Sequence, residues 1–204
     1  MQKAMKKYFP VFVLPTAIAF IVGNTVPFIM AFYLSFCSFT TVNDAKFVGF
    51  TNYVKVFTDS TFLHSMLFSA LFTIVTVILI NVFAFLIALA LTSKIRGTTI
   101  FRTVFFMPNL IGGIVLGYIW QLLLNGILAH WQKTLTYSSV YGFWGLVILL
   151  CWQQIGYMMI IYIAGIQNIS SEMLEAAQVD GANWHQRLFS IIIPSVRPSI
   201  IICV

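Results

Sequence analysis

Residues 60–93 read STFLHSMLFSALFTIVTVILINVFAFLIALALTS and contain no charged side chain. A helix that crosses a bilayer needs about 20 mostly apolar residues, and a charge at its centre costs roughly 2.5–3.5 kcal/mol on insertion scales. The stretch is therefore long and apolar enough to span a membrane. Three other charge-free gaps of this kind cover residues 8–43, 103–132 and 134–171. Together the gaps predict four spanning helices, near residues 11–36, 64–92, 104–126 and 142–167.

The composition favours a membrane protein over the soluble classes. Of the 204 residues, 60% are hydrophobic and 8% are charged, whereas soluble domains have roughly 25% charged residues. Such a balance excludes an ordinary soluble domain, a coiled coil or a nucleic-acid-binding groove. The three cysteines lie in apolar runs without C-x-x-C spacing, so neither a disulfide framework nor a zinc site is predicted. The fold class that follows is an all-α, polytopic integral-membrane bundle.

The two ends of the chain carry further expectations. The first apolar run is about twice as long as the 7–15-residue core of a signal peptide, so residues 11–36 are expected to remain as an anchor. After Pro198 a new apolar run begins, and the residues from Ser199 to Val204 are too few to cross a bilayer. We therefore expect one transmembrane domain over residues 1–204, with four complete spans and the start of a fifth, in a chain truncated inside that span.

Basic residues predict the orientation, because cytoplasmic flanks of membrane helices are enriched in Lys and Arg. One side of the predicted bundle receives six bases: Lys3, Lys6, Lys7, Lys94, Arg96 and Arg102. The other side receives three: Lys46, Lys55 and Lys133. The amino terminus, residues 94–102 and, by parity, residues 169–198 are thus predicted to be cytoplasmic.

Residues 169–198, ISSEMLEAAQVDGANWHQRLFSIIIPSVRP, hold three of the five acids in the chain. Ser170 or Ser171 can cap a helix whose first turns carry two glutamates, favourable at the positive end of the helix dipole. Gly181 favours a left-handed helix stop, and Asn183 can cap a second short helix. The loop is predicted to be a helix-turn-helix elbow. From spacing alone, an interfacial amphipathic linker and a docking surface are equally consistent with it.

The amino-acid sequence of this loop resembles that of a known protein family. Glu175-Ala176-Ala177, three residues, Gly181, nine residues, Ile191, one residue and Ile193-Pro194 resemble the EAA loop of binding-protein-dependent ABC importer permeases. The family pattern usually ends in Ile-x-Leu-Pro, and here Ile193 replaces the leucine. Residues 47–53, FVGFTNY, and 101–110, FRTVFFMPNL, with Trp120 following, are similar to signatures of the carbohydrate subfamily, the maltose and multiple-sugar type. The resemblance covers most of the chain.

The resemblance implies that the elbow is a coupling helix seated in a cleft of a cytoplasmic ATPase subunit. The matched positions in this chain are Glu175, Ala176, Ala177, Asp180 and Gly181. It also implies a second permease subunit, ATPase subunits, an extracellular or periplasmic solute-binding protein, membrane lipid, and a bacterial or archaeal cytoplasmic membrane. ATP and Mg²⁺ would then bind the partner ATPase, with no cofactor on this chain.

No catalytic motif occurs in the sequence. It has no G-x-x-x-x-G-K-[ST] phosphate loop, no H-E-x-x-H zinc motif and no G-x-S-x-G nucleophile turn. No acid is predicted inside a span, so proton-coupled transport has no obvious carrier. The chain is therefore predicted not to be an enzyme and to have no metal or nucleic-acid partner.

Uncharged polar and aromatic side chains in the third and fourth spans suit a neutral, hydroxylated solute. Amides hydrogen-bond to hydroxyl groups and aromatic rings stack on sugar faces, although many polar groups in membranes serve only as interhelical hydrogen bonds. The substrate-pathway candidates are Asn109, Trp120, Gln121, Trp152, Gln153, Gln154 and Tyr157. Residues 152–154 are favoured because they lie near the middle of their span. Gly112, Gly113 and Gly117 are expected to serve helix packing rather than a hinge.

The predicted function is that of a membrane-spanning subunit of an ATP-driven importer for a sugar or oligosaccharide, working by alternating access. One alternative is a permease for another small solute, such as an amino acid, a peptide or an anion. An anion would favour basic residues in the spans, and none is present there. The other alternative is a non-transporting membrane scaffold whose elbow docks a cytoplasmic partner.

Overall fold

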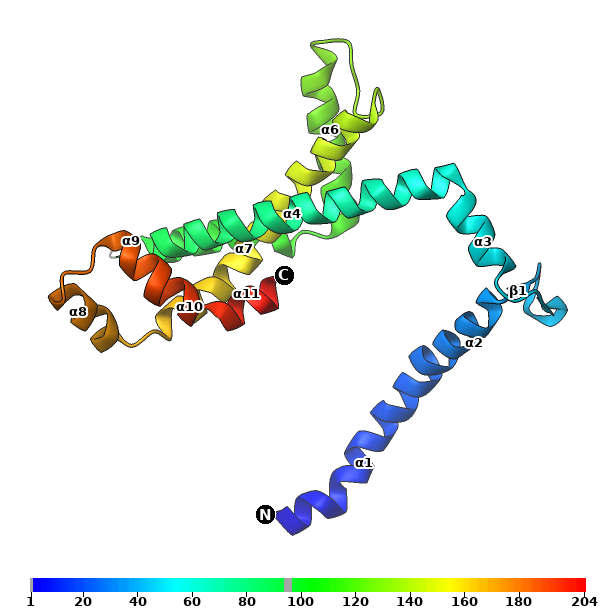
Figure 1. The fold of residues 1–204 in the computed structure, drawn as a ribbon, viewed down its shortest axis with the longest axis horizontal. Helices are drawn as coiled ribbons and strands as arrows, with labels where there is room; N and C mark the ends of the chain where they lie inside the picture. Colours follow the sequence, from blue (N-terminus) through cyan, green and yellow to red (C-terminus); the bar gives the residue numbers. More distant parts are fainter. Residues whose placement is uncertain (1, 94–96) are drawn as a thin grey trace. The chain divides into compact units, whose positions relative to one another are not determined.

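The computed structural model describes residues 2–93 and 97–204 (Figure 1). Lys94 and Arg96, on which part of the charge count depends, lie outside the described residues, as do the side chains of Lys3, Lys6 and Lys7. The chain divides into two compact units, one up to Leu67 and one from Phe68 onward. Among the described residues, three helices are long and apolar enough to cross a membrane, or five if each of two bent pairs is one span.

The first unit begins with three consecutive helical segments, α1 (Gln2–Phe20), the π-helical η1 (Ile21–Thr25) and α2 (Val26–Ser35). Pro27 has no amide hydrogen to donate to the preceding turn, and the wider π turn occurs where that bond is lost. Within this run, Val11–Ser35 is long and apolar enough to be a membrane span. It covers nearly the whole of the predicted range 11–36.

A short hairpin follows α2. Strand β1 (Cys37–Ser38) pairs antiparallel with β2 (Lys46–Phe47), and the 3₁₀ turn η2 (Val42–Asp44) lies between them. The Asp44 carboxylate accepts the backbone N–H groups of Thr41 at 2.8 Å and Thr40 at 3.1 Å. These bonds hold the pKa of Asp44 below its ordinary value, and the bond from the Thr41 N–H has the largest effect. The unit continues through α3 (Thr51–Thr58) into α4 (Ser60–Thr92).

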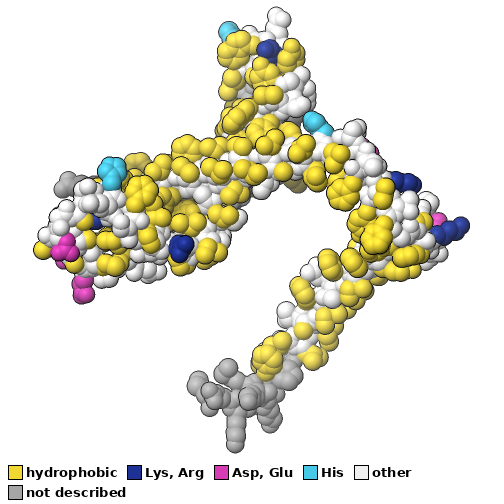
Figure 2. Space-filling view, in the orientation of Figure 1, with side chains coloured by type: hydrophobic (Ala, Val, Ile, Leu, Met, Phe, Trp, Pro, Cys, Tyr) yellow, Lys and Arg dark blue, Asp and Glu magenta, His cyan; other side chains and the backbone are white. Residues whose placement is uncertain are grey.

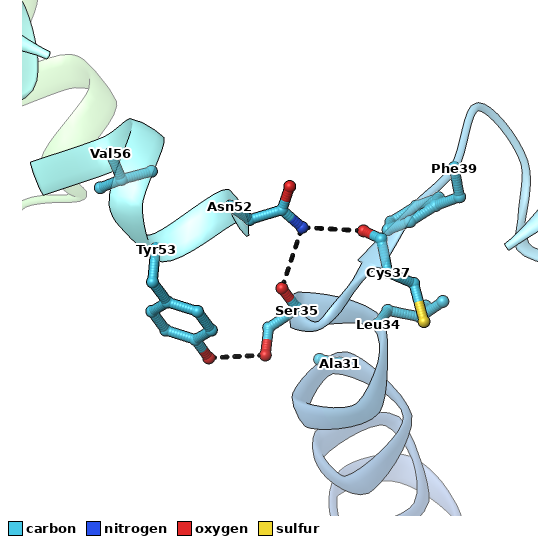
Figure 3. Close-up of a pocket in the computed structure, with 8 residues that line it drawn as sticks. All are labelled: Ala31, Leu34, Ser35, Cys37, Phe39, Asn52, Tyr53 and Val56. Carbon is cyan, nitrogen blue, oxygen red and sulfur yellow. Dashed lines mark hydrogen bonds between the residues drawn. The ribbon is translucent and has the colours of Figure 1, made fainter. Parts of the chain in front are cut away.

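The segment FVGFTNY at residues 47–53 fastens α3 to the end of α2 (Figure 3). Gly49 has a φ of +60°, a left-handed value that favours glycine at the turn. The Asn52 amide donates to the carbonyl oxygens of Ser35 at 3.0 Å and Cys37 at 2.9 Å. The hydroxyls of Tyr53 and Ser35 are 2.6 Å apart. The pocket in Figure 3, about 510 Å³, is lined mainly by apolar side chains around these bonds.

In the described part of the second unit, α4 from Phe68 onward is followed by nine further helical segments. They are α5 (Thr98–Phe106), η3 (Met107–Leu110), α6 (Gly113–Ala129), α7 (Ser139–Gln167), α8 (Ser171–Val179), α9 (Trp184–Arg187), η4 (Leu188–Ile192), α10 (Ile193–Ser195) and α11 (Arg197–Cys203). Helices α4 and α7 cover the predicted ranges 64–92 and 142–167.

Small and apolar residues of three helices form the core of this unit. Ala84 and Ala88 on α4 and Met159 on α7 are fully buried, and Cys203 on α11 completes the cluster. Residues of α4, α7 and α11 thus contribute to one buried apolar cluster. Phe85 and Tyr162 add an edge-to-face ring pair, with centroids 5.5 Å apart.

One polar link crosses this apolar core. The Tyr162 hydroxyl on α7 donates to Asn81 Oδ1 on α4 at 2.6 Å. The Asn81 amide donates to the carbonyl oxygens of Val77 at 2.8 Å and of Cys203 on α11 at 3.2 Å. A buried hydroxyl and a buried amide without partners would each cost free energy, so this pairing satisfies both and joins three helices.

The third predicted span differs from the expectation. The sequence predicts one helix near 104–126, whereas the structure has two pieces, Thr98–Leu110 and Gly113–Ala129, that meet at 99°. Pro108 removes an amide donor, and Gly112 adopts the extended values φ −59° and ψ 134°. A Cβ on Gly112, Gly113 or Gly117 would meet no atom of the described chain within 4 Å, so the helix packing expected of these glycines stays a prediction. Gly112 and Gly113 lie at the bend.

Candidate coupling elbow and polar helix faces

The elbow predicted at residues 169–198 consists of α8 and α9 joined by a left-handed turn. Gly181 has a φ of +78°. Its N–H donates to the carbonyl oxygen of Gln178 at 3.1 Å, and the Ala182 N–H donates to that of Ala177 at 2.9 Å. This pair of bonds is a Schellman motif, which satisfies the last carbonyl groups of α8 and reverses the chain. The left-handed stop at Gly181 therefore agrees with the sequence prediction.

The sequence predicts an N-cap residue for each of the two elbow helices, and the structure can be compared with both predictions. The Asn183 side chain accepts the Gln186 N–H at 2.9 Å, and the Gln186 side chain accepts the Asn183 N–H at 2.8 Å. This capping box confirms the predicted cap of α9. Ser170 occupies the N-cap position of α8, as predicted, but its side chain makes no cap hydrogen bond. The Arg187 guanidinium also reaches Gln178 Oε1, at 3.4 Å, and so ties α9 to α8.

The inner side of the elbow closes over a pocket of about 540 Å³. The pocket lies between the end of α4, the end of α7, α8, α9 and η4, and its lining includes Leu174 and Trp184. Leu174 and Ala177, three residues apart on α8, are both half-buried. Residues of α8 and of the ends of two long helices of the same unit thus line one pocket.

The outer side of α8 is free in this chain. Glu172, Glu175, Ala176 and Val179 recur at helical spacing and are exposed, Val179 to 87%. Asp180 and Gly181 are exposed at the end of the same helix. Figure 2 shows acidic side chains gathered over this part of the second unit. The EAA residues thus divide, with Glu175 and Ala176 facing outward and Ala177 turned toward the unit.

Two glycines of α7 let other segments of the unit approach it closely. A Cβ on Gly156 would overlap the backbone of Phe105 and Phe106 at the end of α5. A Cβ on Gly165 would overlap the Ser199 hydroxyl of α11, next to the fully buried Val196, where the segment Trp184–Ser195 and α11 meet at 63°. The segment that follows the elbow therefore packs directly on α7.

The structure brings together two of the seven pathway candidates from different helices. The rings of Trp120 on α6 and Trp152 on α7 lie edge to face, with centroids 5.5 Å apart and planes at 62°. Trp120 and Gln121 also line a pocket of about 290 Å³ between α6 and the beginning of α7. An aromatic wall beside an amide suits a hydroxylated ring in its chemistry.

The remaining candidates do not converge with this pair. Gln153 and Tyr157 share one face of α7, and Gln154 points about 100° away from Gln153 because successive helical residues are turned by that angle. Asn109 is half-buried in η3. Within the described part of the chain, the side chains of Asn109, Gln153 and Gln154 have no hydrogen-bond partner. The run Trp152-Gln153-Gln154 is therefore a cluster in sequence but not in space.

The sequence did not predict the contacts between helices made at four residues, Asn81, Tyr162, Gly156 and Gly165. Asn81 carried a usable signal, because it is an isolated amide near the middle of an apolar span, where polar side chains find a partner or a cavity. The glycines carried none, since the segments they touch are remote or lie beyond a bend.

Several helices of the described chain are long and apolar enough to cross a membrane, and a short helical elbow lies at the surface. Residues 96–203 match the family described as "Binding-protein-dependent transport system inner membrane component". The chain belongs to this family. The resemblance predicted from the loop and the two flanking signatures is thereby confirmed.

Two curated relatives and one solved structure illustrate the similarity. The chain is 36% identical over 200 residues to the probable starch degradation products transport system permease protein AmyD of Thermoanaerobacterium thermosulfurigenes, which covers 92% of this chain and 67% of AmyD. It is 29% identical over 164 residues to the sn-glycerol-3-phosphate transport system permease protein UgpA of Rhizobium meliloti, which covers 75% of this chain and 55% of UgpA. The chain thus spans about two thirds of one relative and just over half of the other.

The solved structure is that of a bacterial ABC transporter involved in the import of the acidic polysaccharide alginate. The match has a TM-score of 0.78 at 20% sequence identity and covers 98% of this chain and 72% of that one. At this identity the likeness shows the fold.

Proposed function

We propose that the chain is a membrane-spanning subunit of an ATP-driven importer for a sugar or oligosaccharide. Membership of the inner-membrane-component family supports the transport role, and the similarity to AmyD supports a carbohydrate substrate. The solute would cross by alternating access, with ATP and Mg²⁺ bound on a separate ATPase subunit and no cofactor on this chain. The subunit would sit in a bacterial or archaeal cytoplasmic membrane with its amino terminus in the cytoplasm.

The elbow carries this proposal. Its outer face offers the Glu175 carboxylate to a basic residue of the ATPase, and the small Ala176 lets the ATPase surface approach the α8 backbone. Gly181 sets the turn and Asp180 precedes it on the exposed end of α8. Ala177 supports the turn through its carbonyl oxygen, which accepts the Ala182 N–H. Leu174 of α8 and the ends of α4 and α7 line one pocket, so an inward push on α8 would close that pocket and reach both helices.

The pathway is proposed to use the ring pair Trp120 and Trp152 together with Gln121. Aromatic faces and a nearby amide present stacking surface and hydrogen-bonding groups to a sugar. Gln153, Gln154, Tyr157 and Asn109 are secondary candidates. A second permease subunit would complete the pathway, and a solute-binding protein would deliver the sugar from outside.

The similarity to UgpA favours a second candidate function, the import of a phosphorylated polyol. A phosphate-bearing solute would be expected to meet a basic group, yet residues 103–132 and 134–171 contain none. Uptake of radiolabelled maltooligosaccharides against sn-glycerol-3-phosphate, in cells that express the full transporter, separates the two candidates.

A photocrosslinking experiment tests the docking role of the elbow. A photoreactive phenylalanine is placed at Val179, on the outer face of α8, in membranes of a host with the partner genes. Mass spectrometry then identifies the trapped protein. We expect an ATPase with a phosphate-binding loop, because Val179 projects away from the unit.

The matched control places the same probe at Leu174, which is on the same helix but faces the pocket beneath the elbow. Capture of the ATPase from Val179 alone supports the proposal. If neither position captures an ATPase while the chain is inserted, the proposal fails and a scaffold role is favoured.

A further inference from the structure

The hairpin between α6 and α7 carries a lysine held by two tyrosines. The Lys133 ammonium donates to the Tyr141 hydroxyl at 3.0 Å and lies 5.3 Å and 5.4 Å from the ring centroids of Tyr137 and Tyr141. The hydrogen bond to Tyr141 raises the pKa of Lys133, so the ammonium stays charged. Lys133 is the only charged residue between Arg102 and Glu172.

The hairpin loop holds this lysine in a defined place. Asn125 Oδ1 on α6 accepts the Leu135 N–H at 2.9 Å, and Gln132 adopts a left-handed φ of +54°. The Lys133 N–H donates to the Leu128 carbonyl oxygen at 3.1 Å. Three local constraints therefore precede any ligand, which lowers the ordering cost of binding.

An apolar groove of about 300 Å³ runs between α6 and α7 from this point. Its lining includes Ile127, Val140, Trp144 and Ile148, and Tyr141 lines it as well. Tyr141 thus joins the groove to the cation. Figure 2 shows basic and hydrophobic side chains together at the tip of this hairpin.

The side chains around the groove suit the boundary between water and hydrocarbon. Trp131 and Tyr137 are exposed to 62% and 63%, and Trp144 to 50%. Amphipathic aromatic rings favour the headgroup level of a bilayer, while the exposed Ile127 and Val140 suit acyl chains. A cation at headgroup level above an apolar groove matches the two ends of a phospholipid.

We propose that the tyrosine-held Lys133 and the groove beneath it bind an anionic glycerophospholipid. The headgroup phosphate meets the Lys133 ammonium and the Tyr137 hydroxyl, and one acyl chain follows the groove. The site should prefer a headgroup with a net negative charge. In phosphatidylethanolamine the lipid's own ammonium offsets the phosphate charge and so weakens the attraction to Lys133. The expected preference is about fivefold, the ratio for the ~1 kcal/mol of one basic residue near an anionic surface.

Native mass spectrometry of the purified chain in a nonionic detergent measures this preference. Dioleoylphosphatidylglycerol and dioleoylphosphatidylethanolamine are titrated separately. The wild-type chain is expected to bind the glycerol lipid about fivefold more tightly. Lys133→Gln keeps a donor for Tyr141 but removes the charge, so the two lipids should bind equally, with the ethanolamine lipid unchanged. Val140→Trp fills the groove and should weaken both.

Lys55→Gln is the matched control, because it removes one exposed base from α3 and should leave the preference intact. A fivefold preference that survives Lys133→Gln overturns the site, as does equal binding of both lipids to the wild-type chain. Free sn-glycerol-3-phosphate is added as a competitor. Displacement of the lipid by that soluble phosphate would overturn the assignment to a membrane lipid.

Discussion

Gly181 sets the direction of the elbow through its backbone alone. A Cβ at this position would meet no atom within 4 Å, so the cost of a side chain comes from the left-handed φ of +78°. Gly181→Val should cost ~1–2 kcal/mol and raise the exchange rate of the Ala182 amide about tenfold in hydrogen-exchange mass spectrometry. Gly181→Asn, which tolerates this conformation, should have a smaller effect. Equal exchange in both variants and the wild type would refute the role of Gly181.

Other residues at this scale show what local sequence does and does not predict. The cap at Asn183 and the left-handed Gly181 follow from short-range preferences that act within one turn, and the structure has both. The absent side-chain cap at Ser170 shows the limit of the same rule, because a serine there is free to rotate away. The docking and pathway roles stay predictions, since they depend on partners and solutes rather than on backbone preferences.

At the scale of elements, α5 approaches α7 closely at Gly156. A Cβ at this glycine would overlap the backbone of Phe105, and a backbone moves less easily than the end of a side chain. Gly156→Ala should therefore destabilise the second unit by about 1–3 kcal/mol and lower its thermal midpoint in detergent. Gly117→Ala on α6, where nothing lies within 4 Å, is the control. A drop as large in the control would show that the contact at Gly156 does not matter.

The sequence predicts one straight helix near 104–126 and does not predict the bend between α5 and α6. Hydropathy and the absence of charge act on a stretch of sequence as a whole, so they indicate an apolar segment without showing its direction. Pro108 and Gly112 supply the local change, and their effect depends on whether neighbouring segments accept the bend. Helix α7 is such a neighbour, because the backbone of Phe105 lies directly against its Gly156.

Over the whole molecule, the sequence predicts which segments are apolar but not which of them touch. The long apolar helices predicted near 11–36, 64–92 and 142–167 follow from uninterrupted apolar runs. The link between Asn81 and Tyr162 joins residues 81 positions apart, and a single sequence carries no signal for such a pair. The same holds for the approach of Trp120 to Trp152. Composition thus predicts whether a segment suits lipid or water, whereas the contacts between segments are seen only in the structure.

The orientation in the membrane is the remaining property of the whole chain that charge predicts. Helix α7 has 29 residues and is about 43 Å long, more than the hydrocarbon thickness of about 30 Å, so the hairpin before it and the elbow after it lie on opposite sides if it spans. In a variant without the native cysteines, Thr134→Cys should react with an impermeant maleimide in intact cells. Val179→Cys should react only after permeabilisation, because the distribution of Lys and Arg predicts that the elbow is cytoplasmic. Val147→Cys, buried in α7, should react in neither case. Reaction of residues 134 and 179 from the same side would mean that α7 does not cross the membrane.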